Sequence, residues 1–376
     1  MQTRVVISGT GVFTPEETIT NAELVEAFNA YADKQNAEHA VEIAAGTREA
    51  MAHSSEEFIL KASGIERRHV MDKGGVLDPD IMHPTLRQRS DDEPGIMAEM
   101  GVAAVGEALE KAGRTPDDVD AVICAASNHE RAYPAIAIEI QDLLGIQGFG
   151  FDMNVACSSA TFGIQAATDM IRSGSARCIV VVNPEICSGH LEWRDRDCHF
   201  IFGDVCTAVV LERAENATSA TQYEIHATRC LTQFSNNIRN NHGFLRRTRP
   251  DGVGDRRDMQ FMQNGRQVFK QVVPMVSDLI TDHCSAHDVD PTSLDRLWLH
   301  QANKSMNDFI GRKVLGRVPS DVQQPTILDE YANTSSAGSI IAFSQNSDDL
   351  PVGAKGVICS FGAGYSVGNV IVERVA

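Results

Sequence analysis

The chain has 376 residues, of which 43% are hydrophobic, and it carries 33 basic and 51 acidic side chains for a formal net charge of −18. This is the composition of a globular protein with a substantial core. The negative charge argues against general nucleic-acid binding. No apolar run is long enough to span a membrane. The nine cysteines are an odd number and include no CxxC pair, which argues against a disulfide framework or a metal site and favours a cytoplasmic setting.

Apolar strand-like runs alternate with helical patterns along the chain, which is typical of a layered α/β protein. The sequence predicts strands at residues 4–8, 121–126, 178–182, 208–212, 296–300, 356–360 and 369–373. It predicts helices at residues 94–112, 135–144, 160–173 and 268–283, where apolar residues recur at helical spacing. Two insertions are expected, a helical one at 31–57 and a loop at 72–93.

Three short segments recur in the same order in the two halves of the chain. DAVICAA at Asp120 resembles DRLWLHQA at Asp295, CSSA at 157–160 resembles TSSA at 334–337, and AVVLER at 208–213 resembles NVIVER at 369–374. Such a repeat indicates a duplication. We therefore expect two similar halves, residues 1–214 and 215–376, with the active site at their junction and an insertion at about 215–258 covering the entrance.

Cys157 is the first candidate for chemistry. It follows a predicted strand end at 149–155 and precedes a helical pattern, so it lies near a helix N-terminus, where the helix dipole lowers a thiol pKa. The alternative is a packed structural cysteine, which is the commoner role for an isolated one.

His300 and Asn333 are the second and third candidates. Taken singly, His300 at a strand end and Asn333 before a helix start are more often structural. The repeat changes this, because Asn333 lies at the turn that matches the Cys157 turn and His300 ends the strand that matches 121–126. A thiol accepts an acyl group, while imidazole and carboxamide donate hydrogen bonds to an oxyanion.

Seven motifs together resemble one known family. ASGIERRH, ACSSATFG, IFGD, GRQVFK, HQAN, NTSSAG and SFGAG, in this order, are similar to those of the β-ketoacyl-acyl-carrier-protein synthases III of the thiolase superfamily. The resemblance implies a five-layered αβαβα fold of two duplicated halves and a homodimer. It also implies decarboxylating Claisen condensation of an acyl-CoA primer with malonyl-acyl-carrier protein (ACP) in fatty acid biosynthesis, with CoA and phosphopantetheine thioesters as substrates and no further cofactor.

The resemblance also assigns catalytic roles. Cys157 corresponds to the acylated nucleophile, and His300 and Asn333 to the pair that stabilises the enolate formed from the malonyl group. The backbone N–H groups of Cys157 and Ala363 correspond to the oxyanion hole.

Substrate-binding positions are implied in the same way. Phe58 stands where many relatives stack a tryptophan on the CoA adenine, Arg196 fits the other side of that adenine, and Asn303 belongs to the CoA and phosphopantetheine site. Tyr133 matches an aromatic residue that reaches the acyl pocket of the partner subunit. Because the CoA site is altered and the chain is enlarged, we expect a primer longer than acetyl, of medium length.

Other functions fit the same motifs. A synthase-III-like acyltransferase of secondary metabolism, forming a polyketide, ester or amide, would use the same three side chains, and a non-catalytic scaffold would keep the fold with an unreactive Cys157. A thiolase is disfavoured because Cys359 lies before the SFGAG loop rather than within it.

Overall fold

Nine strands with buried apolar faces form the centre of the protein. The computed structural model describes residues 3–241, 243, 248 and 256–376. In the N-terminal half the strands are, in spatial order, β1 (Val5–Phe13), β7 (Asp204–Arg213), β6 (Cys178–Ile186), β4 (Ala121–Ala125) and β5 (Phe149–Met153). In the C-terminal half they are β8 (Tyr223–Ser235), β13 (Gly364–Arg374), β12 (Lys355–Gly362) and β11 (Arg296–Leu299).

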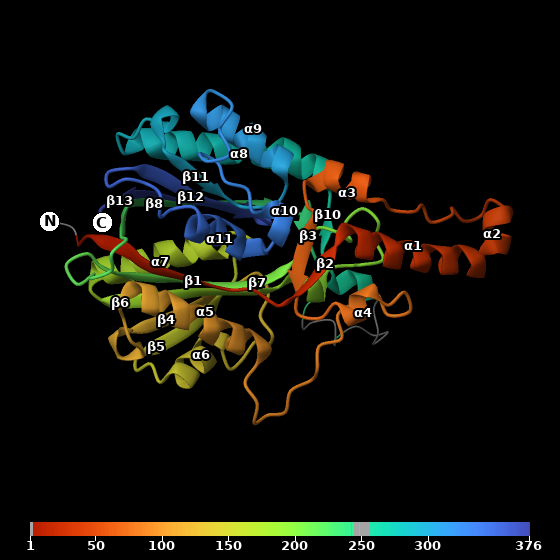
Figure 1. Ribbon diagram of the computed structural model, residues 1–376, viewed down its shortest axis with the longest axis horizontal. Coiled ribbons are helices and arrows are strands. Elements are labelled where there is room, and N and C mark those ends of the chain that lie inside the picture. Colours follow the sequence, from red (N-terminus) through yellow and green to blue (C-terminus); the bar gives the residue numbers. More distant parts are fainter. Residues whose placement is uncertain (1–2, 242, 244–247, 249–255) are drawn as a thin grey trace.

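Helices cover both faces of each half-sheet, because strands that are apolar on both faces need cover on both. Figure 1 shows the resulting order of layers, helix, sheet, helix, sheet, helix. One outer layer contains α5 (Ile96–Ala112) and α6 (Ile136–Leu144) and the other contains α8 (Gly265–Ala286) and α9 (Lys304–Leu315). The middle layer contains α7 (Ser159–Ser173) and α11 (Gly338–Gln345). The predicted five-layered αβαβα fold is confirmed.

The two half-sheets have the same design. The order β1-β7-β6-β4 matches β8-β13-β12-β11, with the same antiparallel, antiparallel and parallel pairings. The halves join through two residue pairs between β1 and β8, Val6 with Glu224 and Ile7 with Tyr223. The duplicated architecture is therefore present in space, whereas the boundary between residues 214 and 215 stays a prediction.

β8 corrects the expected entrance insertion at 215–258. Residues 223–235 of that segment form a strand in the interior of the sheet, paired with β13 and β1. The segment was mistaken for a loop because its residues, YEIHATRCLTQFS, mix charged and polar side chains with apolar ones, and most of them after Ala227 are exposed. Residues 242, 244–247 and 249–255 of the expected insertion lie outside the described residues.

Smaller elements lie at the end of the sheets where the active site is found. They are β2 (Glu17–Thr20), α1 (Asn21–Glu38), α2 (Ala40–Ala44), α3 (Glu56–Ser63), β3 (Arg67–Val70), α4 (Gly74–Leu77), β9 (Ile238–Arg239), β10 (Met262–Gln263) and α10 (Leu328–Tyr331). Thr20 caps α1, since its hydroxyl accepts the Glu23 N–H and Glu23 returns the contact. The expected helical insertion thus begins earlier, at Asn21, and α1 and α2 project from one end of the molecule (Figure 1).

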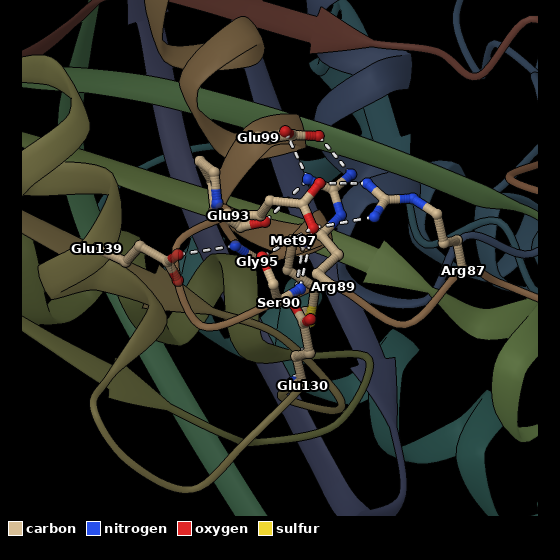
Figure 2. Close-up of polar contacts among 10 residues, drawn as sticks. Arg87, Arg89, Ser90, Glu93, Gly95, Met97, Glu99, Glu130 and Glu139 are labelled. Atoms are coloured by element: carbon tan, nitrogen blue, oxygen red, sulfur yellow. Dashed lines mark hydrogen bonds and ion pairs between the residues drawn. The ribbon is translucent and has the colours of Figure 1, made fainter.

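The predicted loop at 72–93 is ordered by ion pairs and hydrogen bonds at its C-terminal end (Figure 2). Arg87 pairs with Glu93, whose carboxylate also accepts the Ser90 N–H at 2.9 Å. Arg89 pairs with Glu99 of α5. These contacts fix the entry into α5, which packs on β1 and β7.

No helix among the described parts of the chain is both long and apolar enough to cross a membrane; the cytoplasmic location stays a prediction.

Candidate active site

Cys157 lies in a tight turn between β5 and α7. Asn154 forms this turn, because its side-chain oxygen accepts the N–H of Ala156 at 2.9 Å while its NH₂ group donates to the carbonyl of Ser127 at 2.7 Å. Ala156 adopts φ +49°, a left-handed conformation that costs energy for a residue with a Cβ. The sequence prediction of a strand-to-helix turn at Cys157 therefore agrees with the structure, since α7 begins at Ser159.

Asn333 lies in the equivalent turn of the C-terminal half. Its backbone exchanges hydrogen bonds with the 201–203 segment, donating to Ile201 O at 2.9 Å and accepting from Gly203 N at 3.2 Å. Its side-chain oxygen accepts the Ser335 N–H at 2.9 Å. Ser335, like Ala156, is left-handed, with φ +50°. Because the oxygen of the Asn333 carboxamide is occupied, its NH₂ group remains as the donor for a ligand.

His300 directly follows β11. Its N–H donates to Cys359 O at 2.8 Å and its carbonyl accepts from Asn307 at 2.9 Å, which together hold the residue at the strand end. The side chain is 2% exposed. Burial lowers the pKa of His300 to about 4, against the opposing effect of the Ser335 backbone. The imidazole is therefore neutral at physiological pH, and one of its ring nitrogens still carries a proton that can be donated to an anion.

The three predicted catalytic side chains meet in one cavity. A pocket of about 290 Å³ is lined by Cys157, His300 and Asn333, together with apolar residues that include Phe202, Val268, Phe269 and Met306. A second cavity of about 240 Å³ also reaches Cys157 and is lined by Asn128, Asn154, His190 and Ala363. Cys157 thus lies where two cavities meet.

The pKa of Cys157 corrects one expectation. Burial raises it to about 11, and the charge of Glu185 acts in the same direction. The Ser335 hydroxyl and the backbone N–H groups of Cys157 and Ala363 act to lower it but do not outweigh burial. The expected helix-dipole effect is therefore not the dominant one, since desolvation of a buried thiolate is the larger cost.

The SFGAG loop lies against Cys157, the predicted nucleophile. It forms the hairpin turn between β12 and β13, with Ala363 between the strands. A Cβ added to Gly362 would lie 2.6 Å from Cys157 Cβ, so only glycine permits this approach. The N–H of Ala363 and that of Cys157 both act on the same sulfur, which is the arrangement that an oxyanion hole needs.

Of the residues expected to bind CoA, Asn303 lines the cavity that contains Cys157, whereas Phe58 and Arg196 do not. Asn303 lines the cavity, caps α9 by accepting the Met306 N–H at 3.2 Å, and donates to Ala62 O at 2.7 Å. Arg196 lies over the Phe58 ring, with its guanidinium carbon 3.9 Å from the ring centre. The two side chains therefore stack on each other, and an adenine enters between them only after Arg196 moves.

Tyr133 is far from this chain's own cavities. It is 85% exposed and contributes to the lining of neither cavity that reaches Cys157. This placement is what a residue reaching into a second subunit would show; its role stays a prediction.

One group of potential metal ligands lies in the N-terminal half. Ligand atoms of Cys124, His129 and Asp152 lie within 4.8 Å of one another. Both carboxylate oxygens of Asp152, however, accept backbone N–H groups at the start of α6, from Ile136 at 2.8 Å and Ala137 at 2.9 Å. These bonds give Asp152 a structural role in helix capping, and the expectation of no metal stays a prediction.

Sequence reasoning missed Glu185, Ser127 and Ser335, which surround the predicted catalytic residues. Glu185 is 1% exposed at the end of β6 and binds Ser127 and Ser336. A signal was available, because an acidic residue soon after the apolar run of residues 178–182 is unusual in a buried strand and marks a special site. Its partners are distant in sequence and only the fold brings them together.

Comparison with known proteins decides the family. The family model described as 3-oxoacyl-[acyl-carrier-protein (ACP)] synthase III matches residues 151–228, and its C-terminal counterpart matches residues 284–374. A β-ketodecanoyl-[acyl-carrier-protein] synthase of Pseudomonas aeruginosa PAO1 is 59% identical over 350 residues, which cover 93% of this chain and 100% of the relative. A β-ketoacyl-[acyl-carrier-protein] synthase III of Mesorhizobium japonicum is 32% identical over 328 residues, covering 86% of this chain and 93% of the relative.

The chain belongs to the 3-oxoacyl-ACP synthase III family.

As a synthase III, it is an acyltransferase of the condensing-enzyme class, as the sequence predicted. Solved structures agree on the fold: the synthase III of Aquifex aeolicus VF5 superimposes with a TM-score of 0.76 at 22% identity, covering 98% of this chain and 99% of that one. The priming β-ketosynthase of the R1128 polyketide pathway gives 0.77 at 22% identity, covering 99% and 96%. At this identity the two structures support the synthase III fold alone.

Proposed function

We propose that this synthase III condenses a medium-chain acyl-CoA, octanoyl-CoA, with malonyl-ACP to form 3-oxodecanoyl-ACP. The observation that carries the proposal is the 59% identity over the whole length of a β-ketodecanoyl-ACP synthase. A β-ketodecanoyl product has ten carbons, of which a decarboxylated malonyl unit supplies two. The primer therefore has eight carbons.

Acyl transfer to Cys157 is the first half of the proposed reaction. The sulfur attacks the thioester carbonyl, the C–S bond to CoA breaks, and the thiol proton ends on the departing CoA sulfur. Because burial raises the thiol pKa to about 11, the proton leaves during the attack rather than before it, with the neutral His300 as its carrier. The N–H groups of Cys157 and Ala363 bind the oxyanion of the tetrahedral intermediate.

Condensation is the second half. The malonyl C–C bond breaks, CO₂ leaves, and the electron pair passes to the thioester as an enolate. Neutral His300 and the free NH₂ group of Asn333 donate hydrogen bonds to the enolate oxygen, while the carbanion attacks the acyl group on Cys157. The Cys157 thiolate leaves and takes a proton from solvent, which closes the cycle.

The cavity lined by Val268, Phe269 and Met306 suits the pantetheine arm, which is flexible and largely apolar, with Asn303 at its mouth. Phe58 is the platform for one face of the adenine, and Arg196 covers the other face once it has moved away from the Phe58 ring. The acyl chain extends beyond Cys157 toward the second cavity. This division places the thioester carbon beside the sulfur, where the two cavities meet.

The proposed homodimer forms along β5. This strand lies at the edge of the sheet, and exposed apolar side chains accompany it on β5 and α6, namely Ile138, Leu143 and Phe149. An exposed apolar edge strand is normally covered. In such a dimer we expect the exposed Tyr133 of each copy to reach the acyl pocket of the other, the role that the family resemblance implies. For the acidic ACP, Lys304, Arg312 and Lys313 of α9 offer positive charge beside the entrance.

The proposal is tested by intact-protein mass spectrometry after incubation with acyl-CoAs from two to twelve carbons. We expect octanoyl to load fastest and to be absent from Cys157→Ala. Faster loading of acetyl than of octanoyl would refute the medium-chain primer. Incubation of the octanoyl-enzyme with malonyl-ACP should then give 3-oxodecanoyl-ACP; an ester, an amide or a reaction with malonyl-CoA alone would instead support secondary metabolism.

A further inference from the structure

Glu185 is a buried carboxyl group at the centre of the contacts between the two halves. It lies near the end of β6 and is 1% exposed. None of the ion pairs found among the described residues includes it. Its oxygens accept neutral donors: the N–H of Ser127 at 3.0 Å, the hydroxyl of Ser127 at 2.6 Å, the N–H of Ser336 at 3.2 Å, the hydroxyl of Ser336 and, at 3.8 Å, the thiol of Cys187. Burial raises the pKa of Glu185 to about 7, against the opposing effect of the hydrogen bonds from Ser127 and Ser336; a carboxyl group is costly at such a buried site, so its presence requires an explanation.

Ser127 connects Glu185 to the nucleophile turn. The carbonyl of Ser127 accepts the NH₂ group of Asn154 at 2.7 Å, and the Asn154 oxygen accepts the N–H of Ala156 at 2.9 Å. Ala156 is the left-handed residue immediately before Cys157. Two hydrogen bonds from Ser127 to Glu185 thus fix the group on which the strained turn depends.

Ser336 connects Glu185 to the opposite turn. It follows Ser335, whose N–H holds the Asn333 side-chain oxygen at 2.9 Å. Ser335 also acts on the Cys157 thiol through its hydroxyl and on His300 through its backbone. A shift of the 335–336 segment would therefore displace first the Asn333 donor, whose side-chain oxygen the Ser335 N–H holds directly.

We propose that Glu185 is a positioning residue that sets the nucleophile turn of one half and the Asn333 turn of the other at their reactive separation. Cys157 and Asn333 come from different halves of the duplication, so no single element holds both. Glu185 binds Ser127, which supports the Cys157 turn, and Ser336, which follows the Asn333 turn, and it accepts from both the hydroxyl and the backbone N–H of each serine. The inference rests on the proposed roles of Cys157 and Asn333.

The contacts of Glu185 predict which replacement preserves the function. In Glu185→Gln, the amide oxygen in the Oε1 position accepts from the Ser127 N–H and from Ser336, and the NH₂ group donates to the Ser127 hydroxyl, which turns to accept. Glu185→Ala removes the four serine bonds and the weaker contact from the Cys187 thiol. Ser127→Ala and Ser336→Ala each remove one hydroxyl contact and leave the backbone N–H in place.

The experiment separates the two half-reactions. Acyl loading is measured by rapid quench and intact mass with octanoyl-CoA, and decarboxylation is measured as CO₂ release from malonyl-ACP in a Cys157→Ala background. We expect Glu185→Ala to lower both rates about a hundredfold and Ser127→Ala to lower mainly loading, by about tenfold. Ser336→Ala should lower mainly CO₂ release, by about tenfold, while Glu185→Gln keeps both within about threefold of wild type.

Glu212→Ala is the matched control. Glu212 is also a 1% exposed carboxyl and pairs with Arg114. It lies on β7 opposite Cys178, at one end of the β6–β7 pair. Glu185 lies on β6 at the other end of that pair, next to the Ile186–Asp204 pairing. That separation is about 25 Å at the rise of a strand. Loss of the Glu212 carboxylate should lower the Tm without changing the rate of either half-reaction in the folded fraction.

Two results would overturn the inference: a Glu185→Gln variant as impaired as Glu185→Ala, or serine variants that lower both half-reactions equally. The serine variants make small changes, so they report even where Glu185→Ala fails to fold. Failure of the proposed function is distinct, because the wild-type protein itself would then neither load octanoyl nor release CO₂.

Discussion

Arg196 and Phe58 stack on each other, with the guanidinium carbon 3.9 Å from the ring centre and the Arg196 Nε donating to the His53 carbonyl at 2.7 Å. The family resemblance had placed them on opposite faces of a bound adenine. In the free protein they instead close that space, at an interaction worth about 0.5–1 kcal/mol at an exposed site, which is small enough for a nucleotide to displace.

Arg196→Ala should therefore affect only donors that carry the nucleotide. We expect kcat/KM for octanoyl-CoA to fall about tenfold, which corresponds to the loss of one good stacking contact, and kcat/KM for octanoyl-pantetheine to stay unchanged. Arg194→Ala is the control, because Arg194 lies over Tyr31 at 5.6 Å. Equal losses with both donors would show that Arg196 does not contact the adenine.

Alkylation of Cys157 should be slow at neutral pH and should accelerate as pH rises. The pKa of the thiol is raised to about 11, the thiolate is the reactive species, and its fraction therefore increases about tenfold per pH unit below that value. The measurement is the iodoacetamide rate at Cys157 by peptide mass spectrometry from pH 6 to 10. A plateau near pH 7 would contradict the dominance of burial and restore the helix-dipole expectation.

Asn333→Ala should impair condensation far more than acyl loading. Removing a donor to a developing oxyanion lowers the rate of that step, here condensation, by about 10²–10³. Acyl loading should be spared, because Asn333 makes no contact with the N–H groups of Cys157 and Ala363 that we assign to the oxyanion hole.

His300→Ala should impair both steps, since we assign it proton transfer in acyl loading and hydrogen bonding to the enolate in condensation. The pKa of His300, lowered to about 4, predicts that neither rate falls between pH 8 and 5 through its protonation. Equal loss of both steps in Asn333→Ala would reject the assignment.

Gly362→Ala should slow acylation of Cys157 without unfolding the protein. The new Cβ would lie 2.6 Å from Cys157 Cβ and 3.1 Å from its sulfur, so the nucleophile must shift. We expect loading to fall about a hundredfold for a displacement of the order of 1 Å. Gly106→Ala is the control: it lies within α5, where an added Cβ meets nothing within 4 Å, and should raise stability by about 0.5–1 kcal/mol. An unchanged loading rate in Gly362→Ala would mean that the loop adjusts freely.

Residue patterns found most of the elements correctly. Helices 135–144 and 160–173 were located to within about a residue by apolar spacing, because helix periodicity depends on near neighbours. β8 was missed for the opposite reason: its mixed residues become a strand only through pairing with β13 and β1, and that pairing is set by the register of distant segments.

The sequence by itself determined the duplicated α/β architecture and the identity of Cys157, His300 and Asn333 as candidates, because turns and strand ends are local features and the repeat is visible when the two halves of the sequence are compared. Only the tertiary structure decided the ionisation of Cys157 and His300, the Arg196–Phe58 stack and the place of Glu185 between the two turns. These depend on desolvation and on contacts such as Glu185 with Ser336, 151 residues apart, which no local pattern records.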